Sequence, residues 1–588
     1  MRRLSFFLLL FFQCAVSQTS FEKTWATYYN DGFCFIQSST IDKDGNVYMV
    51  GSVKQNSVFS TTINAFQSSY GGGNTDGFIT KFSPNGSVVW ATFFGGNGDE
   101  IIKGVVIDSQ NNVYLIGLTS SSSSIATLNS FRSTIPGSTS SFITKFNSEG
   151  DLGWSTYYTA GGSDITLIGE MGNDYIISLA DIVFFNGNIY VFSNTGENNQ
   201  ATIGVFQEER QTAKYIVSKF SSAGERVWSS YYGINDSLIS GLCVNETGVY
   251  LSGRSSSCDS NPTGYFATQG CFQTENYSEC GTPFISKFNL DGQREWSTYF
   301  GGNNIQDDII IKNSIKCYGN HIYFVGVTYR DDMATIGSYQ ESKDNYFCNY
   351  LVKFNLLGER IWATYFGLNS IDDDYYSLQN SLMIDNYENV YVSGVTNLQQ
   401  NISTLNCYQD NINTPSSSTD FKTDVYVMKF DSEGERIFGT YFGGSHDEYY
   451  ASILPYENKF YLYGITKSTS NIASANSFQS SFDMNGIVSN YDSNIFLARF
   501  DPVNLSSYEI LVNSIKIYPN PAKEYIILSA LENDLQVEIY DMLGKKILQT
   551  QTLAFQTKIN IDSISKGVYL VKISNSKSQY LIQKIIIE

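Results

Sequence analysis

Acidic side chains recur at one point of a repeated pattern in this chain, and carboxylates are the groups from which calcium sites and glycosidic active sites are built. They follow a tryptophan-containing phrase in successive copies, with Asp99, Asp308, Asp373 and Asp447 as the candidate ligands. One interpretation is a ring of carboxylates that binds Ca²⁺ or a cationic ligand. The other is that these side chains cap turns by accepting backbone N–H bonds. The first copy has no equivalent beyond Asp31, so such a ring would be incomplete.

Aromatic side chains in the long loops form a second set of candidates, because an exposed ring offers a flat apolar face to a ligand such as a sugar. The set comprises Tyr265, Phe266, Tyr277 and Tyr346. The regularly spaced tryptophans differ from this set, since they keep register with the strand pattern. We therefore expect them in the core.

The remaining composition excludes several classes of function. The formal net charge is −20, which repels a phosphate backbone and argues against nucleic-acid binding. The chain has only two His and no CxxC pair, so a zinc site is not supported. No nucleophile elbow, HExxH motif or Cys–His pair is present, and no catalytic residue is assigned. Paired carboxylates can cleave glycosidic bonds without histidine, which keeps a carbohydrate-active lyase or hydrolase as an alternative.

The cysteines fall into two groups. Cys258, Cys271 and Cys280 share one long loop, and an exported protein passes an oxidising space, so a disulfide is expected among these three. Cys243 and Cys317 lie in predicted strands and are expected to be buried thiols.

The N-terminus is typical of a secretory signal peptide covering residues 1–17. Arg2 and Arg3 are followed by an apolar stretch over residues 4–12 and a small-residue cleavage site at residues 15–17. No later segment approaches the 18 consecutive apolar residues of a membrane-spanning helix. The sequence therefore predicts an exported protein without a transmembrane helix. We expect this protein to be a monomer.

The same short phrase occurs seven times, at intervals of roughly 65 to 75 residues. It opens at Trp25, Trp90, Trp154, Trp228, Trp296, Trp362 and Phe438. Each copy also has an apolar run, a strand with a fixed tyrosine such as Tyr48, and a strand that ends in a cation and a phenylalanine, such as Lys81 and Phe82. Aromatic and β-branched residues alternate with period two in these segments, which predicts four β-strands per copy.

The two ends of the repeat region complete each other. The Trp25 strand has no partner strand before it, and the strand that ends at Phe500 has none after it. Pairing these two strands closes a ring and removes both free edges. The sequence thus predicts an all-β, seven-bladed β-propeller over residues 18–503. In each blade the apolar run should be innermost, followed by the Tyr strand, the Lys-Phe strand and the Trp strand. The rim with the long loops is the expected binding face.

Two phrases and a dipeptide resemble the SBBP family, a bacterial seven-bladed propeller repeat. They are W-x-T-Y-F-G-G, D-x-x-G-N-V-Y-x-x-G and the Phe-Gln of the long loops, as at Phe66 and Gln67. The resemblance spans about residues 20–503. It implies the propeller fold and supplies no catalytic residues.

The chain changes character after a linker at residues 504–513. Residues 514–588 form short alternating segments separated by turns, which predicts a small Ig-like β-sandwich. The phrases around Tyr518, Pro519, Asn520, Pro521, Gly544, Lys545, Gly567 and Tyr569 resemble the type A C-terminal sorting domain of the type IX secretion system of the Bacteroidetes. The resemblance implies export by that machinery, removal of the domain, and release or attachment at the cell surface. A permanent Ig-like accessory domain is the alternative.

These observations together predict a cell-surface or secreted propeller that binds an extracellular polysaccharide or protein, as an adhesion module would. The alternatives are a carbohydrate-active enzyme that uses carboxylates at the channel mouth, and a structural surface or matrix component. Ca²⁺ is the only cofactor that the sequence suggests.

Overall fold

The structure is a computed structural model. It describes residues 20–588 except 31–33, 58, 162–179, 235–236, 256–263, 277–280, 302–307, 310–314, 344–347, 368–380, 398–401, 414–422, 482–493, 504–515, 530–534, 543, 553–555 and 575–579. The predicted signal peptide lies outside these residues. The chain divides into two compact units, Met1–Pro502 and Val503–Glu588.

In its described part, the first unit consists of seven antiparallel sheets, which we call blades 1 to 7. Blade 1 contains β2 (Cys34–Ile41), β3 (Val47–Lys54), β4 (Thr75–Phe82) and β5 (Val88–Phe94). Blade 2 contains β6 (Glu100–Ile107), β7 (Val113–Thr119), β8 (Ser140–Phe146) and β9 (Leu152–Ala160). Blade 3 contains β10 (Ala180–Phe185), β11 (Asn188–Asn194), β12 (Tyr215–Ser221) and β13 (Arg226–Tyr232).

The remaining blades repeat this pattern. Blade 4 contains β14 (Leu238–Asn245), β15 (Gly248–Arg254), β16 (Pro283–Phe288) and β17 (Arg294–Tyr299). Blade 5 contains β18 (Asp308–Ile309), β19 (Ile315–Tyr318), β20 (His321–Thr328), β21 (Cys348–Asn355) and β22 (Arg360–Phe366). Blade 6 contains β23 (Ser381–Ile384), β24 (Val390–Thr396), β25 (Asp424–Phe430) and β26 (Arg436–Phe442). Blade 7 contains β27 (Glu448–Tyr456), β28 (Lys459–Thr466), β29 (Asn494–Pro502) and β1 (Phe21–Tyr29).

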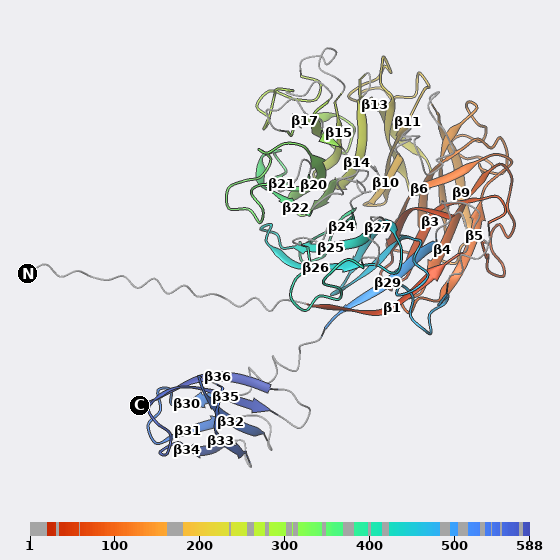
Figure 1. The fold of residues 1–588 in the computed structure, drawn as a ribbon. Coiled ribbons are helices and arrows are strands. Elements are labelled where there is room, and N and C mark those ends of the chain that lie inside the picture. Colours follow the sequence, from red (N-terminus) through yellow and green to blue (C-terminus); the bar gives the residue numbers. More distant parts are fainter. Residues whose placement is uncertain are drawn as a thin grey trace, which may run out of the picture. The chain divides into compact units, whose positions relative to one another are not determined.

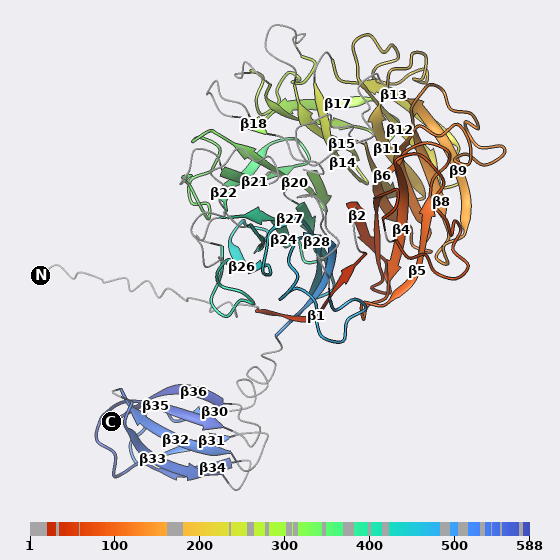
Figure 2. The same ribbon diagram turned by 45° about the vertical axis from the view of Figure 1, so that its right-hand side comes forward.

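The blades form a ring, as Figures 1 and 2 show, and the predicted strand order is confirmed. The apolar run is the first strand of each sheet, and these first strands contact one another in neighbouring blades, as β2 does with β6. The Tyr strand, the Lys-Phe strand and the Trp strand follow outward. The closure is also confirmed, because β1 pairs antiparallel with β29, from Phe21 opposite Pro502 to Tyr29 opposite Ile495.

The three repeated side chains form one row across each blade. In blade 1, Tyr48 is opposite Lys81, which is opposite Trp90. The Lys81 ammonium lies 5.2 Å from the Tyr48 ring centre, and the Tyr48 and Trp90 rings meet edge to face at 6.0 Å. Cation–π and edge-to-face contacts of this kind are favourable. The repeated phrases therefore mark one side of each blade, the side that packs against the next blade.

Each tryptophan ties its blade to the β-turn of the next one. The Trp228 indole N–H donates to the Leu290 carbonyl oxygen at 2.9 Å, and equivalent bonds start from Trp25, Trp90, Trp154, Trp296 and Trp362. Gly292 in that turn has a φ of +84°, and a Cβ there would lie 3.1 Å from the Trp228 ring. The turn thus needs glycine both for its backbone conformation and for the indole above it.

Phe438 occupies the tryptophan position of blade 6, and the closure explains why it differs. Blade 7 is made from both ends of the propeller chain, so no turn joins β29 to β1 and no turn carbonyl can accept an indole N–H. Phe438 instead packs against the rings of Phe21 and Phe460, with centroids 4.9 and 6.4 Å away.

This contact gives a testable substitution. Trp228→Phe should lower the free energy of unfolding by about 1–2 kcal/mol, because one buried hydrogen bond and part of the inter-blade packing are lost. Chemical denaturation measures the change. Phe438→Trp should also destabilise, because Phe438 is fully buried in a filled site that offers no turn carbonyl. A neutral Trp228→Phe variant would contradict the proposed role of the indole N–H.

The second unit contains two small sheets. One has the strand order β30 (Lys516–Tyr518), β31 (Tyr525–Ser529), β34 (Gln556–Asn560). The other has the order β33 (Lys546–Gln551), β32 (Gln536–Asp541), β35 (Gly567–Ser574), β36 (Tyr580–Ile587). Their inward-facing residues share one core, which includes Ile526, Leu528, Val537, Ile539 and Val571.

Candidate binding site on the outer edge of the propeller

The two acidic candidates whose side chains are described act as turn caps. Asp99 Oδ1 accepts backbone N–H bonds from Asn74 and Thr75. Asp447 Oδ1 accepts the backbone N–H of Thr423 at 3.2 Å. The Asp308 side chain and the whole of Asp373 lie outside the described residues. In the part of the chain that the structure describes, no three His, Cys, Asp or Glu side chains form a metal-binding group.

The two loop aromatics that the structure describes, Phe266 and Tyr265, differ from the expectation. Phe266 is fully buried and stacks on Phe284 at 4.4 Å, so its ring belongs to the core of blade 4 and offers no face to a ligand. Tyr265 is partly buried against that core, and its hydroxyl donates to Gln207 Oε1 at 2.6 Å. The reason is that residues 264–273 pack along the Trp strand, where Thr268 N–H donates to Ser297 O at 2.9 Å and Tyr299 N–H donates to Gln273 O at 3.1 Å. Tyr277 and Tyr346 lie outside the described residues.

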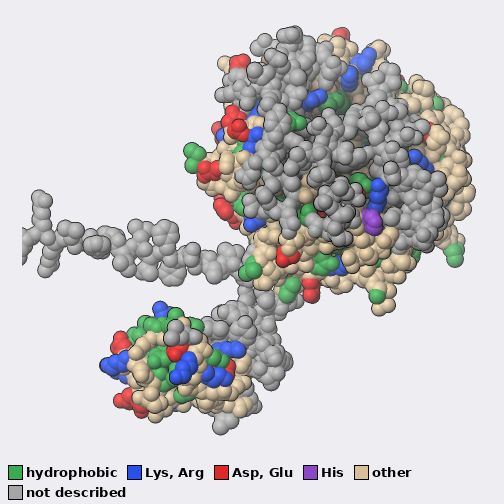
Figure 3. Space-filling view, viewed as in Figure 1, with side chains coloured by type: hydrophobic (Ala, Val, Ile, Leu, Met, Phe, Trp, Pro, Cys, Tyr) green, Lys and Arg blue, Asp and Glu red, His purple; other side chains and the backbone are tan. Residues whose placement is uncertain are grey.

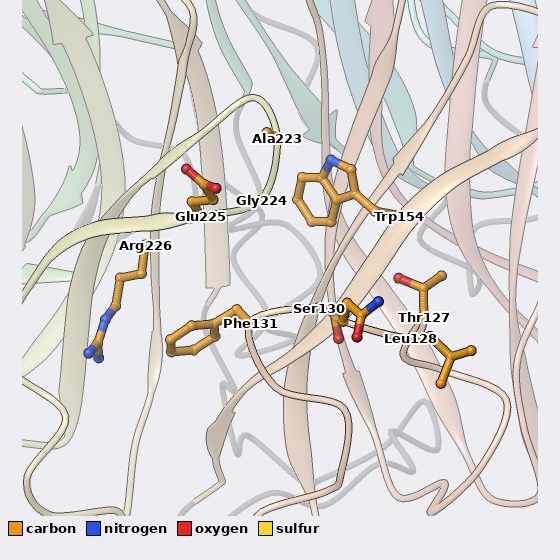
Figure 4. A pocket seen from close by; sticks show the side chains of 10 residues that line it. Thr127, Leu128, Ser130, Phe131, Trp154, Ala223, Gly224, Glu225 and Arg226 are labelled. Atoms are coloured by element: carbon orange, nitrogen blue, oxygen red, sulfur yellow. The ribbon is translucent and has the colours of Figure 1, made fainter.

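A pocket of about 440 Å³ lies between blades 2 and 3. The loop between β7 and β8 contributes Thr127, Leu128, Asn129, Ser130 and Phe131, and β9 contributes Trp154. The turn before β13 and its first residue contribute Ala223, Gly224, Glu225 and Arg226. Figure 4 shows Trp154 on one side, Phe131 and Arg226 on the other, and Glu225 near the turn. The pocket thus lies where a long loop of one blade meets a short turn of the next.

The loop is held in place by a turn on the outer strand. Thr127 donates its backbone N–H to the Ser155 carbonyl at 2.8 Å, and Ser130 N–H donates to Thr127 O at 3.4 Å. Asn129 has a φ of +62°, which asparagine tolerates better than most residues. Leu128 is left at the tip of the turn with 92% of its surface exposed.

The far side of the pocket is fixed by Arg226. Its guanidinium carbon lies 5.0 Å from the Phe131 ring centre, and Nη1 donates to the Gln200 carbonyl at 2.8 Å. Trp154 donates its indole N–H to Ser222 O at 3.1 Å, which sets the angle of the indole. The pocket therefore combines aromatic and aliphatic surface with a fixed cation, a carboxylate and polar side chains.

This set of groups suits binding better than catalysis. Glu225 is the one carboxylate among the lining residues, whereas hydrolysis of a glycosidic bond uses two carboxyl groups that flank the bond. Apolar surface with a few oriented donors and acceptors is the usual composition of a ligand site. On the face of the propeller seen in Figure 3, the described acidic and basic side chains are interspersed along the edge, so that edge has no single sign of charge.

Part of the arrangement recurs at other blade junctions. An arginine at the start of the Trp strand stacks on the loop aromatic of the preceding blade, as in the pairs Arg226–Phe131, Arg294–Phe206, Arg360–Phe272 and Arg436–Tyr339. The tip of the loop turn is an exposed aliphatic residue at Ile63, Leu128, Ile203, Ile336 and Leu405. We did not predict this site from the sequence, although the repeated arginine two residues before tryptophan was a usable signal.

The sorting-motif residues have defined structural roles in the second unit. Asn520 Nδ2 donates to Lys584 O at 3.0 Å, and its Oδ1 accepts the Ile586 N–H at 2.9 Å. Gly544 (φ +82°) and Lys545 form the turn between β32 and β33. Tyr569 is buried in β35, which begins at Gly567, and its hydroxyl donates to Ser565 O. Tyr518 ends β30 and is partly exposed, and Pro519 and Pro521 flank Asn520.

Residues 516–588 match the family model of the secretion system C-terminal sorting domain. This domain indicates secretion across the outer membrane to the cell surface or the extracellular space, with the type IX secretion machinery as partner. Within the described ranges, no helix has the length and apolar character that crossing a bilayer requires.

The chain is similar to several known proteins at 8–25% identity. A WD repeat-containing protein of Acanthamoeba polyphaga mimivirus is 25% identical over 195 residues, which cover 31% of this chain and 13% of that protein. The chain thus spans a small part of that relative's length. The endosialidase of phage phi92 aligns with 97% of this chain and 87% of its own, at a TM-score of 0.35 and 10% identity. A Dyadobacter fermentans protein of unknown function aligns over 82% of this chain and 99% of its own length. Its TM-score is 0.34 and its sequence identity is 8%. These values transfer neither ligand nor activity.

Proposed function

We propose that this exported propeller is an SBBP-type recognition module that binds an extracellular polysaccharide through the pocket between blades 2 and 3. The observation that supports the proposal is the pocket itself, in which Trp154, Phe131 and Leu128 supply apolar surface beside the guanidinium of Arg226 and the carboxylate of Glu225. A sugar presents apolar C–H faces and polar hydroxyls together, and this lining offers partners for both.

The negative net charge of the chain disfavours anionic polysaccharides as ligands. A chain with a formal net charge of −20 repels polyanions at low ionic strength. Neutral polymers do not face this penalty, and polymers with amino groups are attracted by Glu225 and by the overall charge. A neutral or amino-sugar polysaccharide therefore fits better than a uronic-acid polymer.

Binding of the secreted chain to neutral, amino-sugar and uronic-acid polysaccharides tests the proposal. Leu128→Asn and Glu225→Gln each change an exposed lining side chain and should weaken binding about five- to tenfold, which corresponds to about 1 kcal/mol. Arg226→Lys keeps the charge but loses the planar stack on Phe131, and it should weaken binding as well.

The matched control is Leu405→Asn. Leu405 is the equivalent exposed aliphatic residue at the junction of blades 6 and 7, where ring closure leaves no turn to complete a pocket. This variant should bind like the original protein. Equal weakening by Leu128→Asn and Leu405→Asn, or turnover of any polymer without saturable binding, would contradict the proposed site.

A further inference from the structure

Two pairs of buried carboxyl groups occupy equivalent positions in the propeller. Asp76 in β4 faces Glu100, the first residue of β6, at the junction of blades 1 and 2. Asp424, the first residue of β25, faces Glu448, the first residue of β27, at the junction of blades 6 and 7. All four side chains belong to residues that are at most 1% exposed. Ionised carboxylates are seldom buried this deeply without a cation.

At the first junction, the hydrogen bonds leave one oxygen of Asp76 without a donor. Asp76 Oδ2 accepts the Gly71 N–H at 2.6 Å, and Glu100 accepts the Thr119 hydroxyl at 2.5 Å and the Gly96 N–H at 2.8 Å. Asp76 Oδ1 is buried without a partner. A Cβ on Gly95 would lie 2.6 Å from Asp76 Oδ1 and 2.7 Å from Glu100 Oε2, so these two oxygens flank the same point.

The second junction repeats this geometry. Asp424 Oδ2 accepts Gln409 Nε2–H at 2.7 Å and the Asn413 N–H at 2.9 Å, while Glu448 Oε1 accepts the hydroxyls of Thr466 and Ser468 at 2.7 Å each. Glu448 Oε2 is buried and accepts no hydrogen bond from a donor group, and the Asp424 and Glu448 carboxyls are near enough to share a proton. A Cβ on Gly443 would approach Asp424 Oδ1 to 2.3 Å and Glu448 Oε2 to 2.6 Å.

We propose that each pair is held together by one shared proton, so that two blade junctions of the propeller weaken as the pH rises from acidic to neutral values. Two adjacent carboxylates in a dry site repel each other, and one proton converts the repulsion into a charge-assisted hydrogen bond. The proton would lie between Asp76 Oδ1 and Glu100 Oε2, and between Asp424 Oδ1 and Glu448 Oε2.

The groups around the pairs do not neutralise them. The negative charge of Asp99 repels the Asp76 carboxylate, and the negative charge of Asp447 repels the Asp424 carboxylate. Tyr70 and Tyr157 face the first pair and Tyr28 faces the second, and burial raises the pKa of all three hydroxyls, which keeps them neutral. Burial is the largest cause that raises the pKa of Asp76 to about 6 and of Glu100 to about 7. The same cause raises the pKa of Asp424 and of Glu448.

The direction of the pH effect follows from these raised pKa values. Between the unfolded pKa of about 4 and the folded pKa, which is about 6 for Asp76 and about 7 for Glu100, the folded state holds more protons than the unfolded state. The stabilisation contributed by the pairs is therefore largest at acidic pH and falls as the pH rises through this window. Each extra proton multiplies the unfolding equilibrium constant by up to about tenfold per pH unit.

The test combines two measurements on the secreted chain. Denaturant unfolding from pH 5 to pH 8 should show that the unfolding equilibrium constant rises with pH. Glu100→Gln and Glu448→Gln should each lower the pH dependence of this constant by about one proton, because an amide supplies the hydrogen bond without titrating. Glu433→Gln alters an exposed turn carboxylate and should leave the slope unchanged. Infrared spectra near neutral pH should contain a protonated-carboxyl band, and each pair variant should reduce it. If a variant fails to fold, the presence of this band in the original protein still tests the shared proton.

Two outcomes would overturn the proposal. One is a slope that neither pair variant changes, together with no protonated-carboxyl band near pH 6. The other is stabilisation by added Ca²⁺ at pH 8 that a chelator reverses and that Glu100→Gln and Glu448→Gln abolish, because the pairs would then hold a cation in place of a proton.

Discussion

Deleting residues 18–30, which include β1, should destabilise the propeller more than any single substitution. The strand β1 pairs along its length with β29 and buries Phe21, Tyr28 and Tyr29 to 2% exposure or less. Burial of one such side chain contributes about 1.5–3 kcal/mol, so the loss of all three removes about 5–9 kcal/mol. This is a large part of the 5–15 kcal/mol that typically stabilises a folded protein. The deletion also leaves β29 as an open sheet edge, which favours aggregation.

Denaturant unfolding and limited proteolysis would measure this effect, with cleavage expected first in blade 7. The control is deletion of residues 503–588, which form a separate compact unit and should leave the unfolding midpoint of the propeller unchanged. An unchanged midpoint after deletion of β1 would mean that ring closure contributes little to stability.

The strand order was predictable because its signals are local, and the closure was predictable because the first and last strands of the repeat region each lack a partner. Alternation of period two identifies the strands, and the repeated Tyr, Lys and Trp positions fix the register, since they are directly opposite one another in every blade. The replacement of tryptophan by Phe438 was also visible in the sequence. The reason for this replacement was not visible, because it depends on which blade junction lacks a turn once the ring is closed.

The binding pocket was not predictable in the same way. Its residues come from a long loop of one blade and a turn of the next, and the loop has no alternation that would show which side chains face outward. Phe266 illustrates the difficulty, since it was expected on the surface and lies in the core. The buried carboxyl pairs present a similar problem, because Asp424 and Glu448 meet only when two blades pack together.

The disulfide of the propeller was not predicted from the sequence. Cys243 and Cys317 were expected to be buried thiols, but they form a disulfide that joins blades 4 and 5. Cys271 forms no disulfide, and Cys258 and Cys280 lie outside the described residues.

The strand register explains this bond. Cys243 is opposite Tyr250, on the side of blade 4 that packs against blade 5. Cys317 is opposite Ile322, one residue before the fixed tyrosine of blade 5, so it faces the other way and meets Cys243. Their separation of 74 residues is one repeat, with the register shifted by one position. This shift of one position places the two cysteines on the facing sides of neighbouring blades, and the spacing was visible in the sequence.

Replacing both cysteines by serine should therefore lower the free energy of unfolding by about 2–4 kcal/mol, because the disulfide closes a long loop and restricts the unfolded chain. Denaturant unfolding with and without reductant measures the difference. Reductant should destabilise the original protein to the level of the double variant and leave that variant unaffected. Cys271→Ser should keep the full response to reductant, since its thiol forms no disulfide. Alkylation of Cys243 and Cys317 in the unreduced secreted protein would contradict the bond, and blades 4 and 5 would then be held by packing alone.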